Sequence, residues 1–247
     1  MTPQVSYFRR YPQARLDARL HAPARVRARA RALFVACGAL CGLLASQFVA
    51  PADHASAKPM PAIESAWVVS QSELALDALN AIEDIDTSTD LGEIEKRDLA
   101  SKWVKSISKI VAIHLEIDSK KLERVWLMAG IDRQKVLLTA LSQLGVPYKT
   151  NADQPGTALD CSALIKFAWS SVNLDLPRGS AQQYAFGERI KSSEAQLGDL
   201  AWYPGHIAMS LGIENVVIQA PTNGRNVEVH KIDETRVNWV RWVDPTQ

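Results

Sequence analysis

The chain has 247 residues, of which 47% are hydrophobic, and a formal net charge of +1. This apolar content allows a sizeable core and excludes a disordered or fibrous protein. Residues 1–57 hold eight arginines against two aspartates, a charge of +6, so residues 58–247 carry −5. The basic charge therefore belongs to the N-terminal segment, and the sequence does not indicate a nucleic-acid-binding protein.

The first 57 residues have the pattern of an export signal. The arginines end at Arg31, nineteen uncharged and mostly apolar residues follow, and Ala55-Ser56-Ala57 comes after them. A basic stretch, an apolar stretch and an Ala-x-Ala sequence are the three parts of a signal peptide. The alternative is an uncleaved membrane anchor, because nineteen residues approach the ~20 that span a bilayer. Either one predicts that residues 58–247 lie outside the cytoplasm, with the membrane contacted only through an uncleaved anchor.

The three cysteines of the chain differ in their relation to this leader. Cleavage removes Cys37 and Cys41, and an anchor would bury both in lipid. Cys161 then has no disulfide partner in its own chain. A lone thiol in an exported protein is either a small buried hydrophobe or a reactive nucleophile.

Residues 67–130 are predicted to form a small helical module that follows a linker over residues 58–66. The linker prediction rests on two prolines and the absence of an apolar period. From Ser70 apolar residues recur at helical spacing, and Ser70 with Glu73 has the spacing of a capping box. A third helix ends at Gly130. The second helix is predicted to bury a stripe of six residues, namely Leu99, Trp103, Ile107, Ile110, His114 and Ile117.

Residues 131–247 are predicted to form one α+β domain, with helices first and an antiparallel sheet after them. Asp132 begins a helix that Gly145 ends, and Cys161 begins another that runs to about Val172. From residue 198 the apolar period changes to two, which is typical of strands. The predicted strands lie near residues 199–203, 206–211, 216–220, 226–232 and 237–243.

Two polar side chains are predicted to meet on one face of this sheet. Strand alternation places His206 and Ala208 on one face and Ile207 on the other. A hairpin loop over residues 212–215 then pairs Ala208 with Gln219. Gln219 therefore lies one diagonal step from His206, within reach of a long side chain.

These residues have the chemistry of an activated thiol. A thiol reacts as the thiolate, and a helix N-terminus and a neighbouring imidazole both lower its pKa. Cys161 is placed for the first effect, His206 is the candidate base, and Gln219 could fix the tautomer of the imidazole. The alternative interpretation is a buried Cys161, a His206 at a strand start and a Gln219 on the surface.

Five segments, taken in order, carry a family resemblance: "ALSQLGVPY", "LDCSALIKFAW", "LPRGSAQQYAFG", "LGDLAWYPGHIAMSLG" and "VIQAPTNGRNVEV". Over about residues 132–243 the chain resembles the NlpC/P60 family of bacterial cell-wall cysteine peptidases. The resemblance implies a papain-like core that follows the helical module. It also implies that Cys161 is the nucleophile, His206 the base and Gln219 the third polar residue, where the family more often has histidine.

The same resemblance implies a substrate-binding set. Tyr148 resembles the family's tyrosine beside the nucleophile, and Asp160 and Ser162 resemble the pair that receives the free amine of a stem peptide. A plain helix N-cap is the alternative role for Asp160. The chain departs from the family pattern at Ala163, where glycine is usual, and at "YKTNAD", which replaces a glycine-rich turn. Both departures concern the shape of the subsites.

The sequence therefore predicts an exported cysteine endopeptidase that hydrolyses peptidoglycan stem peptides. By resemblance, the bond is the one between D-glutamate and diaminopimelate or lysine. The alternatives are a catalytically weak wall-binding or scaffolding protein, and an amidase or acyltransferase on the same fold. The helical module is predicted to complete the core, to cover the cleft or to dock a wall-associated protein partner.

No cofactor or metal is predicted, because His114, His206 and His230 remain after processing without ligand spacing. His114 is predicted to be a core residue of the module. His230 is predicted to be a solvent-facing strand residue. Arg178 and Arg225 are either surface charges or partners of substrate carboxylates.

Overall fold

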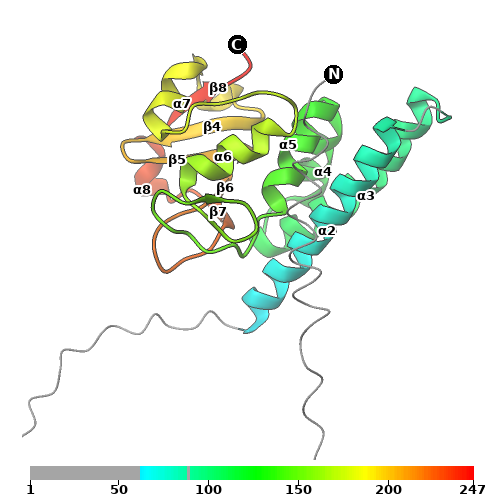
Figure 1. Ribbon diagram of the computed structural model, residues 1–247, viewed down its shortest axis with the longest axis horizontal. Coiled ribbons are helices and arrows are strands. Elements are labelled where there is room, and N and C mark those ends of the chain that lie inside the picture. The colour runs from blue at the N-terminus through cyan, green and yellow to red at the C-terminus, as the bar shows by residue number, and fades with distance from the viewer. Residues whose placement is uncertain (1–61, 88–89) are drawn as a thin grey trace, which may run out of the picture. The chain divides into compact units, whose positions relative to one another are not determined.

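The structure, a computed structural model, describes residues 62–87 and 90–247. The signal or anchor predicted for residues 1–57 lies outside these residues, as do residues 58–61. No helix in the described ranges combines the length and the apolar content that crossing a membrane requires. The described elements belong to one unit, Met60–Gln247. Three N-terminal helices lie beside a domain of helices and antiparallel strands (Figure 1).

The first helix, α2, begins earlier than predicted. It spans Ala62–Thr87, so residues 62–66 of the predicted linker are helical, and Ser70 lies within the helix rather than at its cap. The segment after Pro61, "AIESAW", contains several good helix formers. Proline is also well tolerated at a helix start, so the prolines do not exclude a helix here.

The second helix, α3 (Glu93–Leu115), buries a different stripe from the predicted one. Ile107 is buried as predicted, but Leu99 is 36% exposed and Ile117 lies beyond the helix. The buried positions are mainly small, and they let neighbouring helices approach closely. They are Ala100, Val104, Ile107, Ser108, Val111 and Ala112. The stripe is therefore turned by about one residue toward its smaller side chains.

The remaining elements follow in chain order after α3. The helices are α4 (Ser119–Met128), α5 (Ile131–Leu141), α6 (Cys161–Ser170), α7 (Ser180–Phe186) and α8 (Glu234–Val237). The strands are β1 (Asp153–Gln154), β2 (Ala158–Leu159), β3 (Glu188–Ile190), β4 (Leu197–Tyr203), β5 (His206–Leu211), β6 (Val216–Gln219), β7 (Glu228–Lys231) and β8 (Arg241–Asp244). A short 3₁₀ helix spans Ser192–Glu194. The α+β class is therefore confirmed.

Six strands form the main sheet, in the order β3-β8-β4-β5-β6-β7, and every neighbouring pair is antiparallel. In the β5–β6 pair Met209 lies opposite Ile218 and Ser210 opposite Val217. This is the register that the sequence predicted. The predicted strand over 237–243 is partly wrong, because Val237 ends α8 and β8 begins at Arg241. The sequence did not predict α7 or β3.

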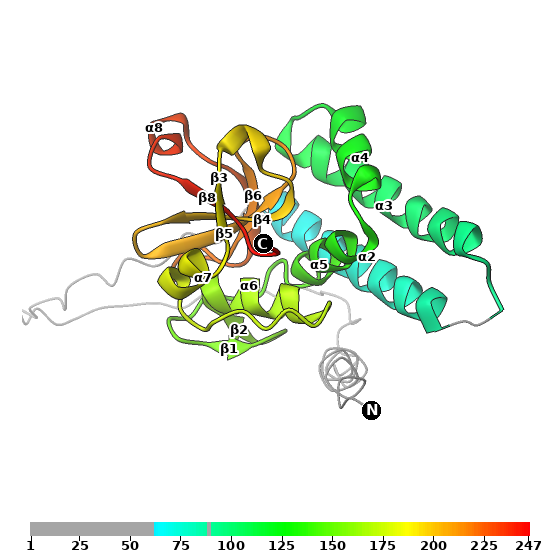
Figure 2. The same ribbon diagram turned by 90° about the horizontal axis from the view of Figure 1, so that it is seen from above.

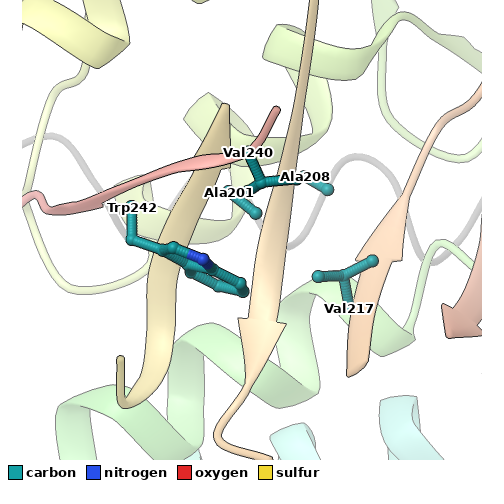
Figure 3. Packing of buried hydrophobic residues seen from close by; sticks show 5 residues of the cluster. All are labelled: Ala201, Ala208, Val217, Val240 and Trp242. Carbon is teal, nitrogen blue, oxygen red and sulfur yellow. The ribbon is translucent and has the colours of Figure 1, made fainter. Parts of the chain in front are cut away.

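The two faces of the sheet have different coverings. One face carries fully buried residues such as Ile207 and Met209, and α6 packs against β5 while α5 packs against β4. The opposite face carries a separate cluster of buried hydrophobic side chains, shown in Figure 3, in which four small residues surround one tryptophan. Its buried residues are Ala201, Ala208, Val217, Val240 and Trp242.

The helical module packs against the domain at the end of β5 that is remote from His206. The indole N–H of Trp126 in α4 donates to the carbonyl of Leu211, the last residue of β5, at 2.8 Å. The hydroxyl of Ser72 in α2 donates to the carbonyl of Ser142 after α5, at 3.2 Å. Figure 2 shows α2, α3 and α4 together beside α5.

Because β5 rises ~3.3 Å per residue, its two ends lie roughly 17 Å apart. The described contacts therefore support the core-completing role for the module rather than the covering of a cleft at His206.

We expect Trp126→Ala to lower the free energy of unfolding by about 3–5 kcal/mol, because the side chain is fully buried and its N–H joins the module to β5. The matched control is Met128→Ala on the same helix, since Met128 is 80% exposed. Urea unfolding, followed by far-ultraviolet circular dichroism, measures the free energy of unfolding of both variants. Equal stability of the two variants would contradict the core-completing role.

Candidate active site

Cys161 is the first residue of α6, and Asp160 is the N-cap of that helix. Asp160 has extended backbone, and its Oδ1 accepts the N–H of Ala163 at 2.9 Å. The carbonyl of Asp160 accepts the N–H of Leu164 at 3.1 Å. These two bonds use the third and fourth amides of the helix and leave the amides of Cys161 and Ser162 near the sulfur. The local sequence thus places a thiol at a helix N-terminus, as predicted.

The thiol of Cys161 is buried, with 8% of the residue exposed. Burial raises the pKa of the Cys161 thiol, while the backbone N–H of Ile207 opposes the rise and the carboxylate of Asp160 adds to it. The amides of Ser162 and Cys161 also favour the thiolate. The amides at the start of α6 lower the thiol pKa as predicted, but burial outweighs them and the net shift is upward.

His206, the first residue of β5, pairs with Gln219, the last residue of β6. The distance from His206 Nε2 to Gln219 Oε1 is 2.9 Å. Gln219 Nε2 donates to Glu228 Oε1 at 3.0 Å, and Arg225 donates to the same oxygen. Since Glu228 takes the amide N–H, the amide oxygen of Gln219 faces the imidazole. His206 Nε2 must then carry the hydrogen, and Nδ1 is the basic nitrogen.

Burial lowers the pKa of the His206 imidazole, and the hydrogen bond to Gln219 opposes this by favouring the protonated ring. The positive charge of Arg236 lowers the pKa further. Together with the raised pKa of Cys161, these shifts favour a neutral thiol and a neutral imidazole in the unliganded protein.

The thiol and the imidazole both lie at the start of β5. The amide of Ile207 points at the sulfur of Cys161, and Ile207 follows His206 in the chain. No hydrogen bond joins the sulfur to the ring within the described ranges. Free enzymes often hold such groups at a longer separation that shortens when substrate binds. The ring of Tyr203 lies 5.0 Å from the His206 ring, between centroids.

Asp160 and Ser162 lie together at the start of α6, and Arg178 joins them. The Ser162 hydroxyl donates to Asp160 Oδ1 at 3.2 Å. Arg178 donates to both oxygens of Asp160, at 2.9 and 2.7 Å, and to the Ser162 hydroxyl at 2.9 Å. The sequence left Arg178 open between a surface charge and a partner of substrate. In the structure this arginine balances the buried carboxylate of Asp160.

Tyr148 is held next to this corner by its backbone. Its N–H donates to the carbonyl of Arg225 at 2.9 Å, and it forms a parallel bridge with Leu159, the residue before Asp160. Its side chain is half-buried. Ala163, where a glycine was expected, is fully buried in α6. The structure thus gathers Tyr148, Asp160 and Ser162 around the start of α6.

A cavity of about 270 Å³ lies beside Gln219 on the sheet face that carries His206. His230 lines it and is half-buried, so the prediction of a solvent-facing His230 is wrong. The predicted alternation itself is correct, since Val227 and Val229 are buried. The error arises because segments after β7 cover this face. Within the described residues no group of three or more His, Cys, Asp or Glu side chains could hold a metal ion.

Three residues of the site were missed or left open by the sequence, and the sequence contains a signal for two of them, Glu228 and Arg225. Glu228 lies directly opposite Gln219 in the β6–β7 register, so extending the strand pairing by one strand would have found it. Arg225 lies three residues before Glu228 and pairs with it. Arg178 lies in the segment "LPRGS", and its contact with Asp160 depends on the loop that follows α6.

A thiol at a helix N-terminus beside a strand with a histidine defines a papain-like α+β domain. The model of the NlpC/P60 family matches residues 145–242. A probable endopeptidase of Corynebacterium glutamicum is 30% identical over 195 residues, which are 76% of this chain and 87% of that protein. The chain belongs to the NlpC/P60 family.

Other relatives match over shorter segments. Peptidoglycan endopeptidase RipA of Mycobacterium tuberculosis is 32% identical over 110 residues, 38% of this chain and 23% of RipA. The bifunctional muramidase/DL-endopeptidase CwlT of Bacillus subtilis is 32% identical over 72 residues, 29% of this chain and 22% of CwlT. Among solved structures, the P60 domain of M. avium subspecies paratuberculosis antigen MAP1204 is 25% identical, with a TM-score of 0.41, and the match covers 47% of this chain and 96% of that one.

We expect the His206 imidazole to titrate below its ordinary pKa of 6.5, and Gln219→Ala to lower that pKa further. The physical reason is that the amide oxygen of Gln219 favours the protonated ring. Nuclear magnetic resonance of histidine-labelled protein measures the pKa. Asn223→Ala, which removes an exposed amide in the turn after β6, is the control and leaves the pKa unchanged. A rise in the pKa of His206 in Gln219→Ala would contradict this hydrogen-bond assignment.

Proposed function

We propose that this protein is a cysteine endopeptidase that hydrolyses the stem peptides of peptidoglycan. The observation that carries the proposal is the pairing of His206 with Gln219 on strands next to the N-terminus of α6, where Cys161 lies. Family membership and the names of the relatives, which include peptidoglycan endopeptidases, support the substrate class. The proposed bond is the one between D-glutamate and diaminopimelate or lysine.

In the proposed reaction Cys161 Sγ attacks the scissile carbonyl carbon while Nδ1 of His206 takes the thiol proton. The amides of Cys161 and Ser162, at the start of α6, are placed to stabilise negative charge at this end of the helix. The carbon–nitrogen bond then breaks, and His206 gives its proton to the leaving amine. Water, deprotonated by the same imidazole, hydrolyses the thioester and restores the thiol.

Gln219 has an orienting role in this scheme. Its oxygen holds the hydrogen of His206 on Nε2, so Nδ1 stays available for the thiol proton. Glu228 and Arg225 hold the amide of Gln219 in that orientation. The raised pKa of Cys161 and the lowered pKa of His206 favour a neutral thiol and a neutral imidazole, so in this scheme the proton moves during the attack.

The free amine of the stem peptide is proposed to bind at Asp160 and Ser162, with Tyr148 beside them. The carboxylate of Asp160 is buried and already paired with Arg178. An incoming ammonium group would therefore share the carboxylate with Arg178 or displace one of its bonds. The stem peptide is the only substrate proposed. The proposed location of the protein is outside the cytoplasm, with the leader either cleaved or retained as a membrane anchor.

A cleavage assay tests the proposal. The chain from residue 58 onwards is incubated with purified muropeptides, and mass spectrometry identifies the products. The masses identify the bond that breaks, and they separate an endopeptidase from an amidase or an acyltransferase. Cys161→Ala should abolish product release while the fold, measured by circular dichroism, is retained, because the change removes the nucleophile and little volume. Binding of muropeptides without any cleavage by the unaltered protein would favour the wall-binding alternative.

We expect His206→Ala to reduce kcat by a much larger factor than Gln219→Ala, because Gln219 only orients a ring that can still accept a proton. Steady-state assays of both variants on one muropeptide measure the difference. Equal, complete losses in two folded variants would argue against this division of roles.

The acid limb of kcat/KM should lie below about pH 6.5, since activity is lost as pH falls through the lowered pKa of His206. Gln219→Ala should move that limb to lower pH.

A further inference from the structure

The cavity beside Gln219 exists because two strands carry alanine at paired positions. Ala201 of β4 lies opposite Ala208 of β5, and both line the cavity floor with Val217 and Val240. Figure 3 shows these small side chains on the sheet. Larger residues here would fill the space. The floor is therefore apolar and shallow, and the polar groups that can bind a ligand lie on the walls.

Arg236 is the wall residue whose charge no carboxylate pairs with in the described residues, although its guanidinium group interacts with the hydroxyl of Tyr203. Arg225 is paired with Glu228. Asp233 accepts the N–H and the hydroxyl of Thr235, at 2.8 and 2.5 Å. In residues 62–87 and 90–247 no ion pair within 4.0 Å joins Arg236 to a carboxylate, although the charge of Asp233 acts on it from a greater distance. Arg236 is exposed, so a ligand can reach its guanidinium group.

The cavity lies next to the imidazole that protonates the leaving amine in the proposed reaction, since Gln219 and Tyr203 line the cavity and contact His206. His206 gives its proton to the leaving amine, so the released part of the substrate lies beside the imidazole ring. Tyr203, whose ring lies 5.0 Å from that of His206, lines the cavity together with Arg236. The charge of Arg236 also acts on His206. Asp160, the proposed partner of the substrate amine, belongs instead to the start of α6.

The second cavity extends this surface. It has a volume of about 330 Å³ and is lined by Tyr203, Thr235, Arg236 and Trp239. Arg236 and Tyr203 line both cavities, so the two cavities are neighbours at these residues.

We propose that Arg236 binds a carboxylate of the amino acid that is released from the stem peptide. This specificity rests on the proposed function, because it needs a leaving amino acid beside His206. A diaminopimelate side chain ends in a carboxylate as well as an amine, and a lysine side chain ends in an amine alone. The main-chain carboxylate of a terminal residue is the other source of the same chemistry.

Four synthetic tripeptides distinguish the two sources. Each begins with L-alanine and γ-linked D-glutamate, and the third residue is meso-diaminopimelate or L-lysine, with its main-chain carboxyl free or amidated. If the side-chain carboxylate binds Arg236, kcat/KM for amidated diaminopimelate exceeds that for amidated lysine by about tenfold. If the main-chain carboxylate binds, the free acids exceed the amides by a similar factor.

The variants test whether Arg236 is responsible. Arg236→Ala should remove the preference for the carboxylate, Arg236→Lys should restore part of it, and Arg236→Glu should reverse it in favour of amidated lysine. Loss of fold cannot produce a reversal, so the result does not depend on unchanged stability. Lys231→Ala is the matched control, because it removes one exposed positive charge from β7, on the opposite face from His230, and it should keep the preference.

The outcomes separate the two proposals. Equal cleavage of all four peptides by the unaltered protein overturns the role of Arg236 and leaves the proposed function standing. A preference that persists in Arg236→Ala also overturns it. Cleavage of none of the four peptides overturns the proposed function, and the inference with it.

Discussion

The site depends on one buried carboxylate at the start of α6. Asp160 caps the helix through the N–H of Ala163, and it binds the hydroxyl of Ser162 and the guanidinium group of Arg178. Arg178 in turn donates to the carbonyl of Ala152 at 3.0 Å. A single charge therefore fixes the helix N-terminus, the loop before it and the loop after it. Because Cys161 directly follows Asp160, these contacts also set the position of the sulfur.

The contacts that stabilise the fold and the residues of the candidate site lie at opposite ends of β5. At one end of β5, Leu211 receives the indole N–H of Trp126, and the helical module completes the core there. At the other end, His206 lies on the sheet face that also carries the two cavities. Arg133 of α5 adds a second connection between helices and sheet through Asp199, at 2.6 Å. The site can therefore hold buried polar groups while most of the core remains apolar.

The sequence was sufficient for the part of the site that strand periodicity controls. The alternation of β5, the short loop over 212–215 and the apolar residues of β6 allow one register, and that register brings Gln219 to His206. The start of α6 at Cys161 was also predictable, because an aspartate before a helix is a strong cap. The family resemblance added the roles of the residues but not the contacts that hold them.

The sequence was insufficient where contacts depend on packing in three dimensions. The pKa of Cys161 rises because the folded protein buries the thiol, and a local sequence pattern does not contain that burial. Arg178 reaches Asp160 only through the course of the loop after α6. The buried face of α3 carries smaller side chains than predicted, because close packing of helices favours small side chains over larger apolar ones. His230 is half-buried because residues that follow β7 in the chain line the same cavity.

The central claim is that His206 acts as the base for the thiol of Cys161. Alkylation of Cys161 by iodoacetamide, followed by mass spectrometry of the peptide that contains it, tests this claim without any substrate. We expect His206→Ala to slow alkylation by about tenfold or more near pH 7, and the rates of the two proteins to converge well above the ordinary thiol pKa of 9.0. Equal alkylation rates at pH 7 in the folded variant and the unaltered protein would contradict the account.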